Sequence, residues 1–516
     1  MIVLEFLFHL ANNHNRMSFT NQSGTLSAFD EVVPDVAAVG GKLSASTLLT
    51  SRRRVRAVPQ TGPSYGSAGS GAAGAQVQVL IADQGGLIDP RSISINYAVQ
   101  VASASSDTTV CVDDGHVFSV VQIALNGQLL ENINSAMKLS NIEMSLGGSR
   151  SYYQSAGSLQ GWELLNPDLT TTVAVGSTST TPAMMPQWGY VTNNVTNLST
   201  RQTRAGVAAW NSVAGEFRSI PLALISGVGR IKQYLPLAIL GELTLIFVCG
   251  SNGEVCFQTG ATADGTYSLS QFTVTYDVVV PDQRYADLLR RVATEEGAGL
   301  TIPFESTVVQ QGGTITGTST ALTESTITVS RATNHLLRVH LVQIPAGTIA
   351  TQTFNGQSCF CHAGTWSVQW RIGSQMYPQI PAQGDSDMFN TALAAYGSVE
   401  QSNGSIINRA LWGNTTNSST AGTAAVYETA QSGTGGGAAK FAYGDKFIPS
   451  YGFQTVKGAA EPLDVDGVSL AGASGSQIVT SIMSAPYYST GYAPYVALVA
   501  LKFIRVRGGA LEIQGA

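Results

Sequence analysis

The chain has 516 residues, enough for two or three domains, and a formal net charge of -6. Charged residues make up 12% of it, about half the roughly 25% typical of soluble domains, and glycine contributes 55 residues. This composition excludes a surface that binds nucleic acid as a whole, because phosphate binding needs concentrated Lys and Arg. It favours a protein that hides much of its surface in an assembly.

The N-terminal region, residues 1–75, is predicted to be an arm and flexible linker. Residues 1–11 are apolar but too short to span a bilayer. Residues 1–16 are therefore an extension before a start at Met17, an interfacial anchor, or an arm that packs under a partner subunit. The stretch 62–74 is rich in Gly, Ser and Ala, which is typical of flexible segments. The one dense basic run is either a solvated linker or a contact for genome or lipid head groups, and it consists of Arg52, Arg53, Arg54 and Arg56.

Residues 76–281 are predicted to form a first β domain, with an insertion at about 147–213. Asn126-Gly127 between two apolar runs predicts a hairpin, because both positions of such a turn need a positive φ. The predicted strands do not alternate with helices as in a βαβ fold, so a β-sandwich or β-barrel is expected. Alternating apolar residues predict strands at 76–81, 93–101, 117–125, 128–133, 235–249 and 267–280.

Residues 282–299 are predicted to form a helix that connects two β domains. Asp282 can cap its start, and glycines at 297 and 299 end it. Its apolar residues recur at i, i+3, i+4 and i+7, so they share one face that can brace the two domains. These residues are Tyr285, Leu288, Leu289 and Val292.

Residues 300–516 are predicted to form a second β domain, with a short helix at 385–399 and an insertion at about 398–440. Trp366 and Trp370 are four residues apart, so a regular strand would place both on one face. Because each β domain carries one long insertion, we expect the two domains to have arisen by duplication of one domain. Strands are predicted at 301–304, 325–329, 335–344, 366–372, 495–506 and 511–514.

Candidate chemical sites are sparse. Cys359, Cys361 and His362 offer either metal ligands or reduced, partly buried thiols, and the five cysteines contain no CxxC pair. The run 113–116, Asp-Asp-Gly-His, is either an acid/base cluster or ordinary turn chemistry. No Walker loop or zinc-protease motif is present in the sequence. We therefore expect no catalytic, cofactor or metal site and no enzymatic activity.

Six segments, in this order along the chain, resemble a known family. They are 86–90 (GLIDP), 118–133 with its Asn-Gly hairpin, 220–245, 285–303, 369–378 and 495–507. Over residues 76–516 the chain resembles the double jelly-roll major capsid proteins of DNA viruses, in the lineage of polinton-like viruses, virophages and adenovirus hexon.

The resemblance implies an all-β fold of two tandem eight-stranded jelly-roll β-sandwiches in one chain, with short helices in the connections and long loop insertions. It also implies a structural major capsid protein that forms pseudo-hexameric homotrimers and tiles an icosahedral shell. Such a protein is located in the virion and is synthesised and assembled inside the host cell.

The partners that the resemblance implies are other copies of the chain, penton and minor capsid proteins, host contacts through outer loops, and an internal membrane or genome at the N-terminal arm. Deleting residues 1–75 is then expected to leave trimers that form no proper shell. The alternative function is a secreted or surface β-sandwich adhesin or carbohydrate-binding protein, and a jelly-roll hydrolase is a third.

Overall fold

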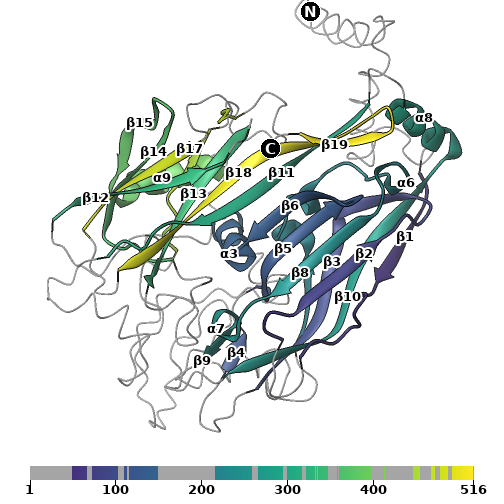
Figure 1. The fold of residues 1–516 in the computed structure, drawn as a ribbon, viewed down its shortest axis with the longest axis horizontal. Helices are drawn as coiled ribbons and strands as arrows, with labels where there is room; N and C mark the ends of the chain where they lie inside the picture. Colours follow the sequence, from purple (N-terminus) through teal and green to yellow (C-terminus); the bar gives the residue numbers. More distant parts are fainter. Residues whose placement is uncertain are drawn as a thin grey trace, which may run out of the picture.

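The computed structural model is built from antiparallel sheets with short helices in the connections (Figure 1). It describes residues 49–66, 72–102, 110–112, 115–148, 216–258, 265–294, 299–316, 321–331, 333, 335–346, 357, 360–396, 412, 446–453, 467–470, 477–485 and 491–514. Most of the two predicted insertions, and all the residues before 49, lie outside these ranges.

Eight strands of the first half form two facing sheets, which we call the first roll. One sheet has the order β1-β10-β3-β7 and the other β2-β8-β5-β6. The strands are β1 (Leu49–Ala57), β2 (Gln76–Ile81), β3 (Leu87–Ala102), β5 (Phe118–Leu125), β6 (Gln128–Asn134), β7 (Glu216–Pro221), β8 (Leu243–Cys249) and β10 (Thr266–Pro281). A small separate sheet pairs β4 (Val110–Val112) with β9 (Cys256–Gln258).

Eight strands of the second half repeat this arrangement in the second roll. Its sheets have the orders β11-β18-β13-β16 and β12-β17-β14-β15, and β19 (Ala510–Gln514) adds to the end of β18. Counted along the chain, both rolls have the orders 1-8-3-6 and 2-7-4-5, the jelly-roll pattern. The predicted fold class is confirmed. The strands are β11 (Leu300–Gln311), β12 (Thr323–Ser330), β13 (Leu336–Pro345), β14 (Thr365–Ile372), β15 (Gln375–Gln383), β16 (Ser450–Gly452), β17 (Gln477–Ser484) and β18 (Tyr492–Arg507).

Each roll has one helix at the same topological position, directly after its fifth strand. In the first roll it is α3 (Ala136–Gly147) and in the second α9 (Gly384–Tyr396). The sequence predicts α9 but not α3, because α3 is buried from Ala136 to Leu146 and mixes polar with apolar residues on its buried surface, so no single apolar stripe stands out. The other short helices are η3 (Leu222–Leu224), η4 (Val228–Arg230), α6 (Leu237–Leu240), α7 (Asn252–Val255) and α8 (Gln283–Thr294).

Local backbone chemistry explains several of these elements. Asn126 and Gly127 have φ values of 49° and 76°, so the predicted hairpin turn between β5 and β6 is confirmed. In β10, Gln271 has a φ of 55° and the register with β3 shifts there. The bulge moves the core-facing positions from odd to even numbers, so Leu269 and Phe272 are both buried.

The structure corrects three expectations. Within the predicted strand 235–249, residues 237–240 form the helix α6, and β8 begins only at Leu243. Residues 49–57 are the strand β1, paired along its length with β10, and not part of a flexible arm. The first roll therefore begins before residue 76, and without β1 it would lack one of its eight strands. In β14, Trp366 is 50% exposed and Trp370 is 1% exposed, so the two do not share an environment. The register of β14 shifts against both neighbouring strands between these residues.

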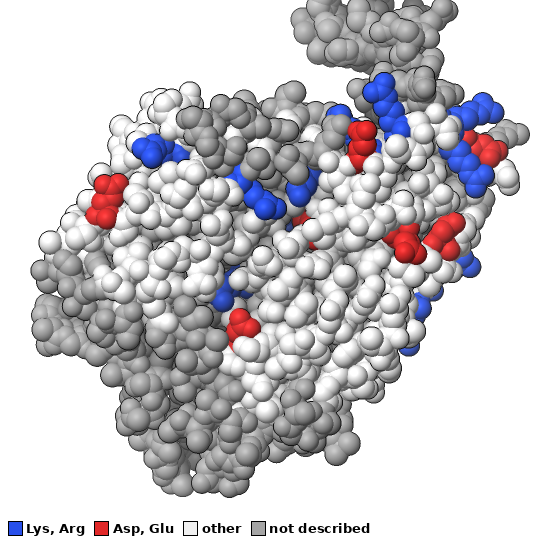
Figure 2. Space-filling view, in the orientation of Figure 1, with Lys and Arg blue, Asp and Glu red and all other residues white. Residues whose placement is uncertain are grey.

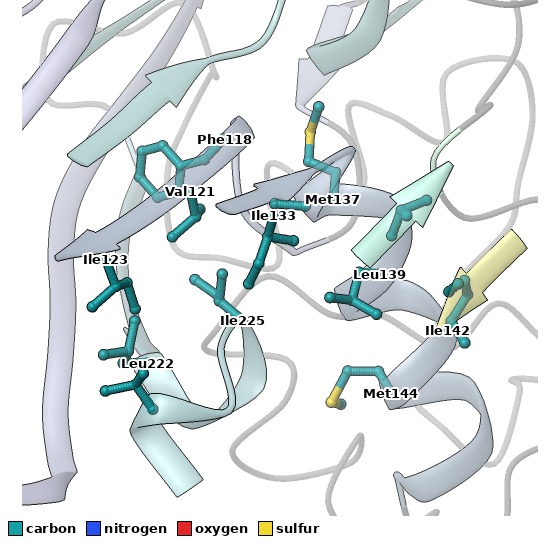
Figure 3. Packing of buried hydrophobic residues seen from close by; sticks show 14 of the residues in the cluster. Phe118, Val121, Ile123, Ile133, Met137, Leu139, Ile142, Met144, Leu222 and Ile225 are labelled. Carbon is teal, nitrogen blue, oxygen red and sulfur yellow. The ribbon is translucent and has the colours of Figure 1, made fainter. Parts of the chain in front are cut away.

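The apolar cores of the two rolls join into one contiguous cluster. Figure 3 shows that α3 contributes Met137, Leu139, Ile142 and Met144 to it, beside Ile133 of the first roll. All ten residues of β13 are buried, as are the first ten of β18. A strand in a free-standing sandwich buries one face only, so these two are covered on both. The second cover is the first roll.

Candidate functional site: the junction between the two rolls

The helix α8 connects the two rolls along the chain and lies at one end of the molecule, near α6 and β19 (Figure 1). Tyr285 and Leu289 are buried in a small apolar cluster with Leu87 of the first roll, and burial raises the pKa of Tyr285 to about 12. Val292 is also buried, and the amide of Gly509, after β18, donates to the carbonyl of Ala293 at 3.2 Å. The side chain of Leu288 lies outside the described residues. The helix thus contacts both rolls, and its role as a brace stays a prediction.

The main junction brings β6 and η4 of the first roll against β11 and brings α3 against α9. Side chains of β13 and β18 also reach α3 and β6. At one point backbone meets backbone, because a Cβ on Gly227, just before η4, would lie 1.6 Å from the carbonyl oxygen of Glu305 in β11. Only glycine allows this approach. The two rolls therefore form one packed body.

Four charged side chains form a closed ring across the junction. Arg338 donates two hydrogen bonds to Glu305, at 3.3 and 2.6 Å, and lies 3.9 Å from Glu143 of α3. Arg230 of η4 lies 3.3 Å from Glu143 and 3.5 Å from Glu305. Each roll contributes one acid and one arginine, so every member has a partner in its own roll and another in the opposite one. Sequence reasoning missed this ring, because nothing in the spacing of its members indicates that they meet.

Further polar contacts cross the same junction. Lys138 of α3 donates to the side chain of Gln357 at 2.9 Å and lies 4.9 Å from the centre of the Tyr495 ring in β18. Asn141 donates to the Gln357 carbonyl at 2.9 Å. Gln128, at the start of β6, donates to the carbonyl of Leu511 at 3.1 Å. These contacts pair polar groups of one roll with polar groups of the other.

A buried acid lies beside the ring. Glu131 of β6 accepts hydrogen bonds from the Ser226 hydroxyl and, at 3.3 Å, from the Val228 amide. Burial raises the pKa of Glu131, although these hydrogen bonds and Lys502 oppose the rise. Lys502 of β18 donates to the carbonyl of Leu130 at 3.4 Å, and burial lowers its pKa.

Two of the described histidines, His116 and His340, are held in structural positions. His340 of β13 is fully buried and hydrogen-bonds Ser450 through Nδ1 at 2.8 Å, and burial lowers its pKa to about 3. His116 stacks on Phe118 and accepts a hydrogen bond from the Phe118 amide at 3.2 Å, as a turn residue does. Asp113 and Asp114 lie outside the described residues.

The other candidate ligands do not converge either. Cys249, Cys256 and Cys361 are buried and form no disulfide bond with one another, while His362 lies 2.8 Å from Asp385. Cys359 lies outside the described residues. Within the described ranges, no group of three or more His, Cys, Asp and Glu side chains is placed to hold a metal ion. None of the described helices is long and apolar enough to cross a membrane.

The four arginines of the basic run lie on β1, at the edge of the first roll. Arg52 lies 3.0 Å from Asp89 and 2.7 Å from Asp277, and Arg54 donates to the Thr275 hydroxyl at 3.1 Å. Arg53 donates to the carbonyl of Gln84. All four are exposed, Arg56 included, but they are fixed on a strand and not carried on a flexible tail.

Comparisons with known proteins were made at the levels of sequence and fold. Searches with protein-family models and among curated proteins found no match. Among solved structures, the Faustovirus major capsid protein matches with a TM-score of 0.50 at 10% identity, over 95% of this chain and 99% of that chain.

Two further solved structures are similar. The mavirus major capsid protein matches with a TM-score of 0.47 at 12% identity, over 93% of this chain and 94% of that one. A chain of the Sputnik virophage structure matches with a TM-score of 0.49 at 11% identity, over 91% of this chain and 89% of that one. From its strand order and its match to the Faustovirus protein, this chain has the double jelly-roll fold of a viral major capsid protein.

Proposed function

We propose that this chain is a structural major capsid protein whose copies form homotrimers with a pseudo-hexameric outline, and that these trimers tile an icosahedral virus shell. The observation that carries the proposal is the tandem itself: two rolls of identical strand order, locked into one body by a buried junction. Three such bodies supply six similar rolls, which is what a six-sided tile needs. The Faustovirus protein of the same fold is a major capsid protein by name.

The surface chemistry supports burial in an assembly. Only 12% of the residues are charged, and Figure 2 shows wide areas of one face without Lys, Arg, Asp or Glu. A monomer with so few charges has little to oppose association. Contacts between neighbouring copies would cover these uncharged flanks.

The proposal implies a place and a set of partners. The chain would be synthesised in the host cell and located in the virion. A closed icosahedral shell has fivefold vertices that six-sided tiles cannot fill, so a penton protein is required there, and minor capsid proteins would join the tiles. Host contacts are proposed for the predicted insertions, which lie outside the described residues. No enzymatic role is proposed.

The proposal is tested by the mass and form of the purified chain. Native mass spectrometry should give a species at three times 54.0 kDa, and electron microscopy should show six-sided particles. A chain that stays monomeric over the accessible concentration range and binds glycans would refute the capsid role and support the adhesin or carbohydrate-binding alternative.

A further inference from the structure

The strand β12 leaves one edge of the second roll without a neighbour in the described ranges. It is the end strand of its sheet and pairs with β17 over all eight of its residues, with no shift in register. Figure 1 shows it at the outer flank of the second roll. In an antiparallel sheet, alternate residues direct their N–H and C=O groups to opposite sides. Half of β12 therefore directs these groups away from β17, where no described residue hydrogen-bonds them.

The sequence of β12 also lacks the usual protection of an edge strand. A long, regular edge offers a template for pairing with another chain, so proteins normally blunt it with proline, basic residues or a bulge. β12 contains no proline, no basic residue and no bulge. By contrast, the edge strand β1 carries four arginines, and the edge strand β15 carries Pro378 and Pro381.

The first roll covers the equivalent edge with its own chain. β2 and β12 are the second strands of their rolls, and each lies at the end of a sheet. The amide of Gln60, in the connection after β1, donates to the carbonyl of Gln78 in β2 at 3.0 Å. No described residue of the connection between β11 and β12 makes such a bond to β12. The second roll thus keeps open an edge that the first roll closes.

Resting on the function proposed above, we propose that the free edge of β12 binds an extended segment of a partner protein, which pairs antiparallel with it as an added strand. In this mode of binding the main-chain hydrogen bonds supply affinity, and the side chains supply specificity. A shell built from trimers needs proteins that join them, and the segment would belong to such a protein.

Two charges define the segment that fits. Glu324 lies near the start of β12 and Arg331 directly after its end, and both are exposed and form no ion pair with any described residue. A segment with a base opposite Glu324 and an acid opposite Arg331 would pair both. Between them, the inward positions Ile327 and Val329 are buried and the outward ones are Ser and Thr. The partner segment should therefore alternate apolar β-branched with small polar residues.

The same charges argue against β12 of a second copy as the occupant. Opposed residues of two paired strands share a face, and side chains alternate between the faces along each strand. A twofold pair of β12 strands would therefore oppose Glu324 only to even-numbered residues, so that it never meets Arg331 of the other copy. Both charges would stay unpaired, whereas a separate segment can pair both.

Hydrogen exchange of the full chain, measured by mass spectrometry, tests the proposal with a synthetic peptide. The peptide has the length of β12, begins with Glu, ends with Lys and alternates Thr and Val between them. At saturating peptide, the amides of β12 should exchange roughly tenfold more slowly, and those of β15 should not change. The same peptide with Pro at two adjacent central positions should give no protection, because Pro cannot donate a main-chain hydrogen bond.

Charge variants test the register of the added strand. Glu324→Lys should weaken binding of the peptide roughly fivefold, and a peptide with Glu at both ends should restore it. Glu242→Lys is the matched control, because Glu242 is an exposed acid of the first roll, directly before β8. It should bind the first peptide like the unaltered chain, and circular dichroism should show that both variants are folded. Equal binding by the two variants would overturn the proposed register.

The outcomes separate this inference from the proposed function. A chain that forms trimers but shows no protection of β12 by the peptide overturns the docking inference alone. A chain that stays monomeric but shows this protection keeps the docking edge and refutes the capsid role. Protection of β12 that rises with protein concentration in the absence of peptide would assign the edge to a second copy, which also overturns the inference.

Discussion

Gly227 and Glu305 bring the backbones of the two rolls into direct contact. A Cβ on Gly227 would lie 1.6 Å from the Glu305 carbonyl oxygen and 2.6 Å from its carbonyl carbon. The φ of Gly227 is -67°, which any residue can adopt, so this glycine is required by space and not by conformation. Because the obstacle is backbone, no rotation of a side chain can relieve it.

Gly227→Ala should therefore separate the rolls locally and reduce the free energy of unfolding by about 3 kcal/mol or more, as overpacking at a rigid contact does. Urea unfolding followed by tryptophan fluorescence measures the change. Gly313→Ala is the control, since a Cβ there would meet no atom within 4 Å. Equal stabilities of the two variants would show that the junction can yield.

Arg338→Met should reduce stability by roughly 3–5 kcal/mol, because it leaves the nearly buried Glu143 and its neighbour Glu305 with only Arg230 as a cationic partner in the ring. Arg91→Met is the control, because Arg91 is 46% exposed and lies 3.8 Å from Asp89, so its loss should cost less than about 1 kcal/mol. Chemical denaturation of both variants gives the comparison. If Arg338→Met costs no more than Arg91→Met, the ring does not hold the rolls together.

Stability should fall as the pH is lowered below neutrality. Burial lowers the pKa of His340 and of His116 to about 3 in the folded chain, whereas the unfolded chain takes up these protons near 6.5. Between these values the unfolded state binds more protons, so stability is complete above about 6.5 and is lost progressively toward 3. Each histidine contributes at most about 1.4 kcal/mol per pH unit.

The raised pKa of Glu131 acts in the opposite direction, because its stabilising contribution is lost as the pH rises through its folded value. Histidine variants isolate the histidine effect from it. Unfolding of His340→Gln at pH 7 and pH 5 should show a smaller loss than the unaltered chain, by roughly 2 kcal/mol. His116→Gln should behave alike, and unchanged pH dependence in both would contradict the assignment.

Deleting N-terminal residues tests whether the basic run belongs to a strand of the first roll or to a flexible arm. A chain that begins at residue 49 keeps β1 and should unfold like the full chain. A chain that begins at residue 76 loses β1, exposes the edge of β10 and removes Tyr65, which pairs with Leu269 and packs on Phe272. This second chain should aggregate on expression, which replaces the expectation of intact trimers. Soluble trimers from it would restore the interpretation of residues 1–75 as an arm.

Much of the fold was visible in the sequence because amphipathic elements repeat with a fixed period. The strand β10 and the helix α8 each have one buried face and one solvent-exposed face. This produces the alternation of apolar and polar residues in β10 and the apolar stripe of α8. The strand β1 was missed because its arginines dominate the composition. Val55 and Ala57 between and after them are the inward positions, and this alternation was the available signal.

The junction was not predictable in the same way. No side of α3 is exposed to solvent, so its sequence lacks the amphipathic pattern that predicts a helix. Glu143 and Arg338, which meet at the junction, are far apart in the sequence. Which faces of two sandwiches meet depends on shape and on pairing between distant residues. Neither leaves a local pattern, so the fold class could be predicted from one sequence whereas the ring of charges could not.

The register of β11 with β18 also constrains how the protein is made. Leu300 pairs with Val506 and Gln311 with Tyr495, so the first strand of the second roll acquires this neighbour only when almost the last strand has left the ribosome. Until then β11 and β13 both lack the strand between them, and β13 offers ten consecutive residues that are buried in the finished protein. Such long-range pairing is slow and prone to aggregation. We therefore expect the second half of the chain to need protection during synthesis, by a chaperone or by the first roll already folded beside it.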